Sequence, residues 1–267
     1  MSELFRAQGL SHRFRDGTEA LKRIRLTIED GEFIVIAGRN GSGKTLLARH
    51  LVGISTATAG SLLFRGADLR SVMKALRSSV GFVFQDTDSQ ILGQTVAEDV
   101  AFGPANMRLS PSEIAARTKE ALAEAKLSGA EERRPETLSG GEKRRLAIAG
   151  VLAMRPDCVI LDEPFANLDL ESARDIIRIC GELKGKGITL IIVTHELEKI
   201  LFLADRLVIL DGGEICFDAA PSEAAPELFA EHGLACPFEG QFPWTYPRDG
   251  MPASVIPLKA DLGVREP

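Results

Sequence analysis

The pattern of apolar and polar positions divides most of the chain into short buried strands and amphipathic helices. Apolar runs at 33–37, 159–161, 189–193 and 206–210 have the length and composition of strands that are buried on both faces. Between them, apolar residues recur at helical spacing, as they do over 172–184. This alternation predicts an α/β fold with a mainly parallel sheet that helices cover on both faces.

One internal segment has a different character. Residues 86–137 lack the strand pattern, and the string Ser110–Pro111–Ser112–Glu113 is typical of a helix start. Ser110 is a good N-cap, Pro111 suits the first helical position, and Glu113 stands three positions after the cap. We therefore expect an α-helical subdomain, at about residues 86–150, inserted into the α/β core.

The two ends of the chain also differ from the core. Residues 1–80 contain short strands and turns, and the run 61–64 before an Arg–Gly turn predicts a hairpin, hence an N-terminal antiparallel β part. Residues 79–84 predict another short strand. After position 218 the composition becomes rich in proline. We expect residues 219–267 to form a short C-terminal extension that is partly irregular.

Composition and charge exclude several classes of protein. The chain has 267 residues, of which 45% are hydrophobic and 26% charged, as in ordinary globular proteins. Its formal net charge of −6 disfavours bulk binding to nucleic-acid phosphates. No apolar run approaches the roughly 18–20 residues that span a bilayer, and the N-terminus lacks a secretory pattern. We expect a soluble chain of the cytoplasm.

A glycine-rich loop follows the apolar run 33–37. Residues 38–45 spell GRNGSGKT and match the pattern GxxxxGK[ST]. The glycines let backbone N–H groups point at phosphate oxygens, Lys44 reaches the β- and γ-phosphates, and the Thr45 hydroxyl is placed to bind Mg²⁺. Strand and helix on either side favour a P-loop NTPase core over a chance glycine turn. The residues expected to contact the nucleotide here are Asn40, Gly41, Ser42, Gly43, Lys44, Thr45 and Leu46.

Two acids emerge at the end of another buried strand. Asp162 and Glu163 directly follow the apolar run 159–161. We expect Asp162 to face the bound Mg²⁺ through water, and Glu163 to orient or deprotonate the water that attacks the γ-phosphate. Two neighbouring acidic residues at a strand end are common on protein surfaces. The phosphate loop in the same chain favours the catalytic interpretation.

The string LSGGE at 138–142 narrows the class of protein. Ser139 is a good N-cap for the helix that follows, and Gly140 and Gly141 allow close backbone approach to an anion. Alone, the string indicates only a capped helix start. Between the helical segment and the carboxylate strand, it closely resembles the signature of ABC-transporter ATPases, which is usually LSGGQ.

Other positions resemble that family in the same order along the chain. Gln85 resembles the Q-loop glutamine, which belongs to the catalytic set and binds the metal. Asp169 lies in a stretch that resembles the D-loop, His195 is similar to the switch histidine that contacts the γ-phosphate, and Phe14 occupies the position of a ring that stacks on adenine. Alone, His195 would be interpreted as a hydrogen-bonded strand-end histidine and Phe14 as core packing. The ordered set over about 3–218 favours the functional roles.

The resemblance implies a mechanism. The nucleotide is ATP, held with Mg²⁺, and two chains face each other head to tail. Each ATP lies between the phosphate loop of one chain and Ser139, Gly140 and Gly141 of the other. ATP closes this interface, and hydrolysis reopens it.

The chain departs from the family pattern at a few positions. Glu142 replaces the usual glutamine of the signature, Leu46 removes a hydroxyl that often touches the α-phosphate, Arg39 stands where proline is frequent, and Phe14 where tyrosine is frequent. None of these changes removes a group that the reaction needs. We therefore predict an active ATPase.

The segments 85–92 and 95–104 are similar to the ATPases of energy-coupling factor importers, which take up vitamins and cobalt or nickel ions. The resemblance implies a second ABC ATPase subunit, identical or related, a transmembrane coupling subunit and a substrate-capture subunit as partners. It also implies a peripheral location at the cytoplasmic face of the cell membrane. The apolar residues expected to line a groove for coupling helices are Phe82, Phe84, Ile91, Leu92 and Val96. Core packing of a helical insert is the alternative for each.

Two other functions compete with an importer ATPase. Non-transport ABC ATPases that act on DNA or ribosomes share these motifs, but they carry long coiled coils or two ATPase domains in one chain. This sequence has one phosphate loop and no heptad run, so no nucleic-acid partner is expected. An ATP-binding regulator without turnover would lack Glu163 or His195, and both are present. The domain prediction is an ABC ATPase domain at 1–218 and the extension at 219–267.

Overall fold

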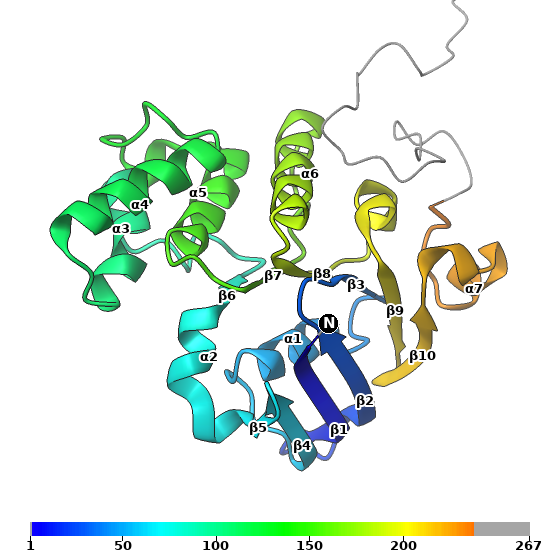
Figure 1. Cartoon of the computed structure of the whole chain (residues 1–267). Coiled ribbons are helices and arrows are strands. Elements are labelled where there is room, and N and C mark those ends of the chain that lie inside the picture. Colours follow the sequence, from blue (N-terminus) through cyan, green and yellow to red (C-terminus); the bar gives the residue numbers. More distant parts are fainter. Residues whose placement is uncertain (1, 238–267) are drawn as a thin grey trace, which may run out of the picture.

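The computed structural model describes residues 2–237, which form two β-sheets and a set of surrounding helices (Figure 1). The part of the expected C-terminal extension from 238 to 267 lies outside the described residues. Within the described part, the extension contains helix α7 (Pro226–Glu231).

The smaller sheet is the predicted antiparallel β part. Its strand order is β2–β1–β4–β5, and β1 pairs with both β2 and β4 in antiparallel fashion. Phe5 of β1 lies opposite Phe64 of β4, and their rings are 5.3 Å apart between centroids. The strands are β1 (Glu3–Arg13), β2 (Glu19–Glu29), β4 (Ala59–Phe64) and β5 (Ala67–Asp68).

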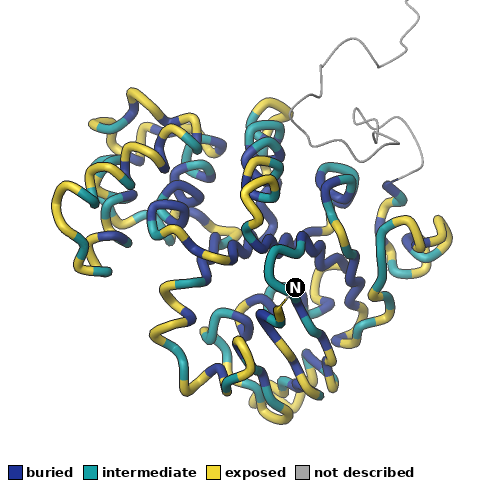
Figure 2. Tube along the Cα trace, viewed as in Figure 1, coloured by how far each residue is buried: buried dark blue, intermediate teal, exposed yellow. Residues whose placement is uncertain are grey.

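The larger sheet is mainly parallel, as the sequence predicts. Its order is β10–β9–β3–β8–β7–β6, and only the edge strand β10 runs antiparallel to its neighbour. The strands are β3 (Phe33–Ala37), β6 (Val80–Val83), β7 (Cys158–Asp162), β8 (Thr189–Val193), β9 (Arg206–Asp211) and β10 (Glu214–Ala219). Every residue of β3, β7 and β8 is buried (Figure 2). This burial explains why these strands appear in the sequence as continuous apolar runs.

The larger sheet separates two hydrophobic cores. On β3, Phe33 and Val35 pack in the core that holds helices α5 and α6. Ile34 and Ile36 point to the other face and pack with helix α1 and the antiparallel sheet. Successive side chains of a strand point to opposite faces, so one buried strand serves both cores.

Helices α3, α4 and α5 form a helical group beside the sheets, at the upper left of Figure 1. Ser110 caps α4, because its side chain accepts a hydrogen bond from the Glu113 N–H at 3.3 Å. The helices are α1 (Lys44–Leu51), α2 (Met73–Ser79), α3 (Val96–Asn106), α4 (Pro111–Glu124), α5 (Gly140–Leu152) and α6 (Leu170–Gly185). In residues 2–237, no helix is long and apolar enough to cross a membrane.

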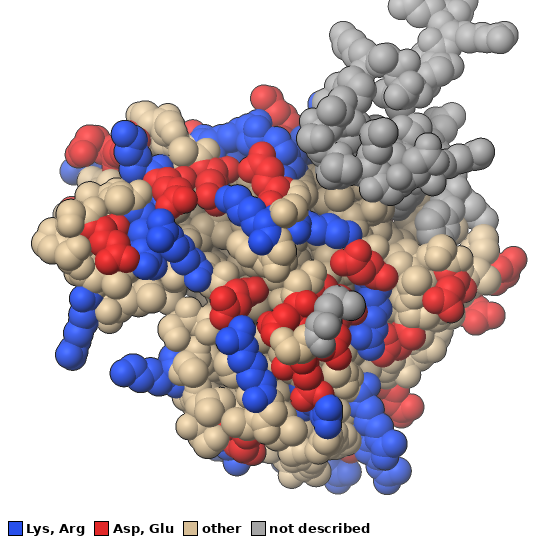
Figure 3. Space-filling model, viewed as in Figure 1, with Lys and Arg blue, Asp and Glu red and all other residues tan. Residues whose placement is uncertain are grey.

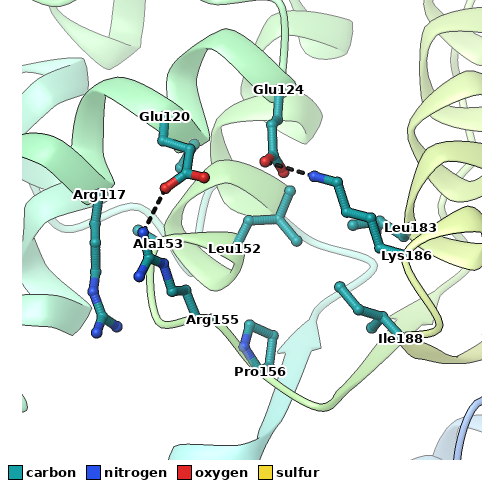
Figure 4. A pocket seen from close by; sticks show the side chains of 11 residues that line it. Arg117, Glu120, Glu124, Leu152, Ala153, Arg155, Pro156, Leu183, Lys186 and Ile188 are labelled. Carbon is teal, nitrogen blue, oxygen red and sulfur yellow. Dashed lines mark hydrogen bonds and ion pairs between the residues drawn. The ribbon is translucent and has the colours of Figure 1, made fainter.

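An ion pair joins the helical group to the end of α6 (Figure 4). Lys186 Nζ, just after α6, lies 2.7 Å from Glu124 of α4. A second pair, Arg155 with Glu120 at 2.8 Å, ties the end of α5 to α4. Exposed pairs of this kind contribute about 0–1 kcal/mol each, so most of the contact energy comes from the apolar core beneath them.

Several element boundaries differ from the sequence prediction by one or two residues, and hydrogen bonds explain two of these differences. The strand expected at 79–84 ends at Val83, because the Phe84 N–H bonds to the Gln90 side chain at 3.0 Å instead of a neighbouring strand. Helix α6 begins at Leu170, before the expected start at 172, because Asp169 caps it by accepting a bond from the Ser172 N–H at 2.7 Å.

Candidate active site

The topology of the larger sheet brings the predicted catalytic segments to one edge. Strands β3, β8 and β7 are neighbours and run parallel, with Ile36 opposite Val193 and Val193 opposite Asp162. The phosphate loop leaves β3, Glu163 follows β7, and His195 follows β8. We call the carboxyl ends of these three strands, with the loops that leave them, the catalytic edge. Ligands of open α/β sheets bind at such edges.

Glycines of the phosphate loop meet steric demands that other residues would not. Gly38 has φ +151°, and a Cβ there would collide with the carbonyl oxygen of Leu210. Gly43 is left-handed (φ +104°) where it caps α1, and a Cβ there would crowd the carbonyl of Ala20. The loop is therefore a tight backbone turn that ends at a helix N-terminus, which favours anions.

Lys44 lies at the centre of the site and is only 5% exposed. Its ammonium donates to the carbonyl oxygens of Gly38 at 2.6 Å and Arg39 at 3.0 Å, and it lies 3.9 Å from Glu163 Oε1. Burial lowers the pKa of Lys44, while the charges of Glu163 and Asp162 oppose that shift. A buried cation with these neighbours is suited to hold the oxygens of a phosphate chain.

The other loop residues differ in what they offer to a nucleotide. Asn40 and Gly41 are exposed, and the side chain of Leu46 packs against the core of the antiparallel sheet, so Leu46 contributes only its backbone N–H to the helix start. Ser42 is buried, and among the described residues its Oγ has no hydrogen-bond partner. Buried hydroxyls are usually paired, so this atom fits a phosphate oxygen as its partner.

Thr45 and Asp162 meet across the site. The Thr45 hydroxyl donates to Asp162 Oδ1 at 2.9 Å. Burial raises the pKa of Asp162, the hydrogen bond from Thr45 counteracts this, and the charge of Glu163 adds to the rise. One hydroxyl and one carboxylate are hard oxygen donors of the type that Mg²⁺ takes together with substrate phosphates and water. These two residues therefore fit a magnesium ion.

Glu163 and His195 form the second contact of the catalytic edge. Nδ1 of His195 lies 3.0 Å from Glu163 Oε2 and 3.1 Å from Oε1. Glu163 is 5% exposed and has φ +46°, a strained value for a residue with a side chain. Such strain costs about 1–3 kcal/mol and often occurs at functional sites. The geometry gives a fixed carboxylate and an imidazole beside the lysine that would hold the phosphates.

Gln85 and Phe14 make fewer contacts than the other predicted residues. Gln85 is exposed and follows β6, whose Val83 is paired with Leu161 next to Asp162, so it leaves the sheet at the same edge. Phe14 is 48% exposed in the turn between β1 and β2. Its ring and that of His12 form a T-shaped pair with 4.9 Å between centroids. Both side chains are accessible to a ligand.

The remaining predicted residues lie in a different place. We call Ser139, Gly140 and Gly141 the signature turn; it is the start of α5. Gly141 packs against Ser172 at the start of α6, so the signature turn lies beside Asp169. The body of α5 packs in the core on one face of the larger sheet, and the body of α1, which follows the phosphate loop, in the core on the other.

Comparison with known proteins identifies the family of the chain. The profile of the ABC transporter family matches residues 21–166. The chain belongs to the ABC transporter family. The relatives of this chain include proteins named energy-coupling factor transporter ATP-binding protein EcfA. The one from Methanosarcina acetivorans is 41% identical over 237 residues, covering 88% of this chain and 86% of the relative. The one from Methanocaldococcus jannaschii is 41% identical over 222 residues, covering 82% and 80%.

Solved ABC structures show the same fold. The structure of cbiO1 from Clostridium perfringens, described as part of the ABC transporter complex cbiONQ, has a TM-score of 0.77 at 36% identity, covering 86% of this chain and 92% of that one. An ATP-binding cassette solved as a dimer in a post-hydrolysis state with ADP and phosphate has a TM-score of 0.73 at 28% identity, covering 81% and 98%. The predicted family, its ATPase activity and its fold are confirmed.

The structure of this ABC ATPase also reveals two site residues that the sequence analysis missed. The hydroxyl of buried Thr194 donates to Glu163 Oε2 at 3.2 Å and so helps to orient the carboxylate. Buried Arg144 of α5 donates to the Phe84 carbonyl at 2.9 Å, directly before Gln85. Burial lowers the pKa of Arg144, and the charges of Asp162 and Asp86 raise it. The only feature of the sequence that could have indicated a role for Thr194 is its place between a buried strand and His195.

Proposed function

We propose that this chain is the ATP-hydrolysing subunit of a membrane import complex of the energy-coupling factor type. The observation that carries the proposal is the 41% identity to an energy-coupling factor ATP-binding protein over 88% of the chain. The same similarity favours an importer over the alternative of an ABC ATPase that acts on nucleic acid or ribosomes. On the face seen in Figure 3, acidic and basic side chains are interspersed over the helical group, without the single-sign patch that nucleic acid would favour.

The catalytic edge supports hydrolysis of ATP by its own residues. The backbone of the phosphate loop and Lys44 bind the phosphate chain, and Ser42 adds a hydroxyl. Thr45 and Asp162 would hold Mg²⁺, which when bound supplies positive charge to the phosphate oxygens. Glu163, oriented by Thr194 and His195, accepts a hydrogen bond from the attacking water and takes its proton. Phe14 offers an exposed ring for adenine.

The position of the signature turn supports a second ATPase chain as partner. The helices that begin at the phosphate loop and at the signature turn pack on opposite faces of the larger sheet. In the head-to-tail arrangement, the signature turn of each chain meets the phosphate loop of the other, and each site becomes complete on closure. The related cassette solved as a dimer with ADP and phosphate agrees with a two-chain assembly.

An apolar groove supports docking of a transmembrane coupling subunit. We call it the docking groove; it has a volume of about 380 Å³ and lies between α2 and β6 on one side and α3 and α5 on the other. Phe82, Phe84 and Leu92 line it, as expected from the sequence. Ile91 and Val96 do not, because Ile91 packs on the core and Val96 is buried at the start of α3. Exposed Phe102 and Ile54 line the groove as well. A membrane-embedded partner, together with a substrate-capture subunit, would hold the chain peripherally at the cytoplasmic face.

The test is affinity purification of the tagged full chain from detergent-solubilised membranes of its source. We expect polytopic membrane proteins to co-purify with the unaltered chain and to be lost with Phe102→Asp, which puts a charge into the docking groove. The matched control is Ala116→Asp on the exposed side of α4. ATP turnover of the isolated chains should be equal in all three. Recovery of ribosomal proteins or nucleic acid in place of membrane proteins would refute the importer.

A further inference from the structure

The fourth residue after the start of the signature, Glu142, brings a negative charge to a turn that is proposed to meet a triphosphate. Glu142 is fixed there by a capping box: its N–H donates to Ser139 Oγ at 3.2 Å, and its Oε2 accepts from the Ser139 N–H at 2.8 Å. Like charges repel each other, and a triphosphate carries several negative charges. An uncompensated Glu142 would therefore oppose closure of the two chains.

Arg133 supplies the compensating charge. Its guanidinium donates to Glu142 through Nη1 to Oε1 at 2.6 Å and through Nη2 to Oε2 at 3.4 Å. Nη2 also donates to the Thr137 carbonyl at 3.0 Å, which fixes the orientation of the guanidinium. The hydrogen bond from Arg133 is the largest cause that lowers the pKa of Glu142, so the carboxylate is ionised at neutral pH and the pair has no net charge. Planar two-point contacts of this kind are specific to arginine.

The backbone holds Arg133 in this position independently of Glu142. The Arg133 carbonyl accepts a hydrogen bond from the Val96 N–H at 3.0 Å, and the Glu131 carbonyl accepts one from the Ala97 N–H at 3.0 Å. The loop that carries Arg133 is thus anchored to the first turn of α3. These backbone hydrogen bonds place the Arg133 side chain near the signature turn, so its position does not depend on Glu142 alone.

We propose that Arg133 is a positioning residue for the signature turn, which neutralises and orients Glu142 so that Ser139, Gly140 and Gly141 can approach the triphosphate held by a second chain. This rests on the proposed head-to-tail dimer. It predicts a dependence between positions 133 and 142: the arginine matters because the signature carries a glutamate. With glutamine at 142, which also forms a capping box, the compensating charge has nothing to neutralise.

The experiment is a double-mutant cycle on dimerisation of the full chain, driven by a non-hydrolysable ATP analogue with Mg²⁺. We expect Arg133→Ala to weaken dimerisation by roughly tenfold or more, with unchanged binding of the analogue to the monomer. Glu142→Gln should dimerise at least as well as the unaltered chain. Arg133→Ala combined with Glu142→Gln should lose no more than about twofold to threefold relative to Glu142→Gln alone.

The matched control is Arg155→Ala, which breaks another exposed ion pair of the helical group, with Glu120 at 2.8 Å. It should leave dimerisation unchanged, and raising the salt concentration should shrink the loss caused by Arg133→Ala. An equal loss from Arg133→Ala in the unaltered chain and in the Glu142→Gln variant would show a purely structural role and overturn the proposal. If the unaltered chain forms no dimer with the analogue, the head-to-tail assembly fails and this inference fails with it.

Discussion

The catalytic edge and the signature turn are built in opposite ways. At the catalytic edge, Lys44, Asp162 and Glu163 are buried, and side chains far apart along the chain bond to one another, as Thr45 does with Asp162, 117 positions away. The signature turn is exposed at Ser139 and Gly140, and its polar groups bond within a few residues, as Ser139 does with Glu142 three positions on. One site is assembled by the fold, the other by a helix cap.

This contrast explains what each region can do. Buried groups that fix each other are suited to chemistry, because the positions of charges are set before the substrate arrives. An exposed helix start with satisfied local bonds keeps its shape without a partner and still presents N–H groups to an anion. The difference predicts that changes at the catalytic edge alter turnover or folding, whereas changes at the signature turn alter association.

The sharpest test of the contrast is Glu163→Gln. Removing the proton acceptor should lower ATP turnover by roughly 10²–10⁴, the usual range for loss of a general base, while nucleotide binding is retained. The measurement is steady-state phosphate release beside equilibrium binding of ATP. The control Glu214→Gln, at an exposed acid that begins β10, should leave both unchanged. Turnover near that of the unaltered chain in Glu163→Gln would remove Glu163 from the catalytic role.

A second test uses the dependence of stability on pH. His50, in the last turn of the helix that starts at Lys44, is 2% exposed, and its pKa is lowered from 6.5 to about 4, mainly by burial and further by His12. The unfolded chain takes up this proton at higher pH than the folded chain, so stability falls as the pH drops from about 6.5 towards 4. Between pH 7 and pH 5 the expected loss is ~2 kcal/mol from this group.

The measurement is urea unfolding of the unaltered chain and of His50→Leu at both pH values. The leucine variant should lose ~2 kcal/mol less stability between pH 7 and pH 5, because the other titrating groups are shared. An identical pH dependence in the two proteins would contradict the burial of a neutral histidine in the helix that starts at Lys44.

The sequence was informative where local pattern and chemistry coincide. The continuous apolar runs predicted the parallel strands, because burial on both faces leaves no polar positions. The helix start at Ser110 was predicted because its cap uses only neighbouring residues. The phosphate loop was predicted because backbone chemistry dictates its glycines. The signature turn, a local structure, could be recognised from its string together with its place between the helical segment and the carboxylate strand, although its role remains a prediction.

Long-range contacts could not be predicted from the sequence. Nothing in the string around Arg133 indicates that it contacts Glu142, since the chain must fold back through Thr137 before the two side chains meet. Arg144 and Phe84 are 60 positions apart, and their contact depends on how α5 packs against β6. Ile91 and Val96 were expected in the docking groove because they are apolar, but apolarity cannot distinguish a groove wall from a core.

The smallest expected effect tests whether the catalytic edge depends on one hydroxyl. Thr194→Val keeps the shape of the side chain and removes the donor to Glu163 Oε2. Hydrogen bonds to charged groups contribute about 1.5–3 kcal/mol, and His195 still contacts the same carboxylate, so we expect turnover to fall by roughly tenfold with little change in ATP binding. Thr189→Val is the matched control at the other end of β8, the strand that Thr194 follows, because the Thr189 hydroxyl accepts a hydrogen bond from the Gly31 N–H there. That variant should lose stability but keep its turnover. If both valines reduced turnover equally, the effect would come from the strand and not from the carboxylate, and the catalytic edge would be less finely ordered than its hydrogen bonds indicate.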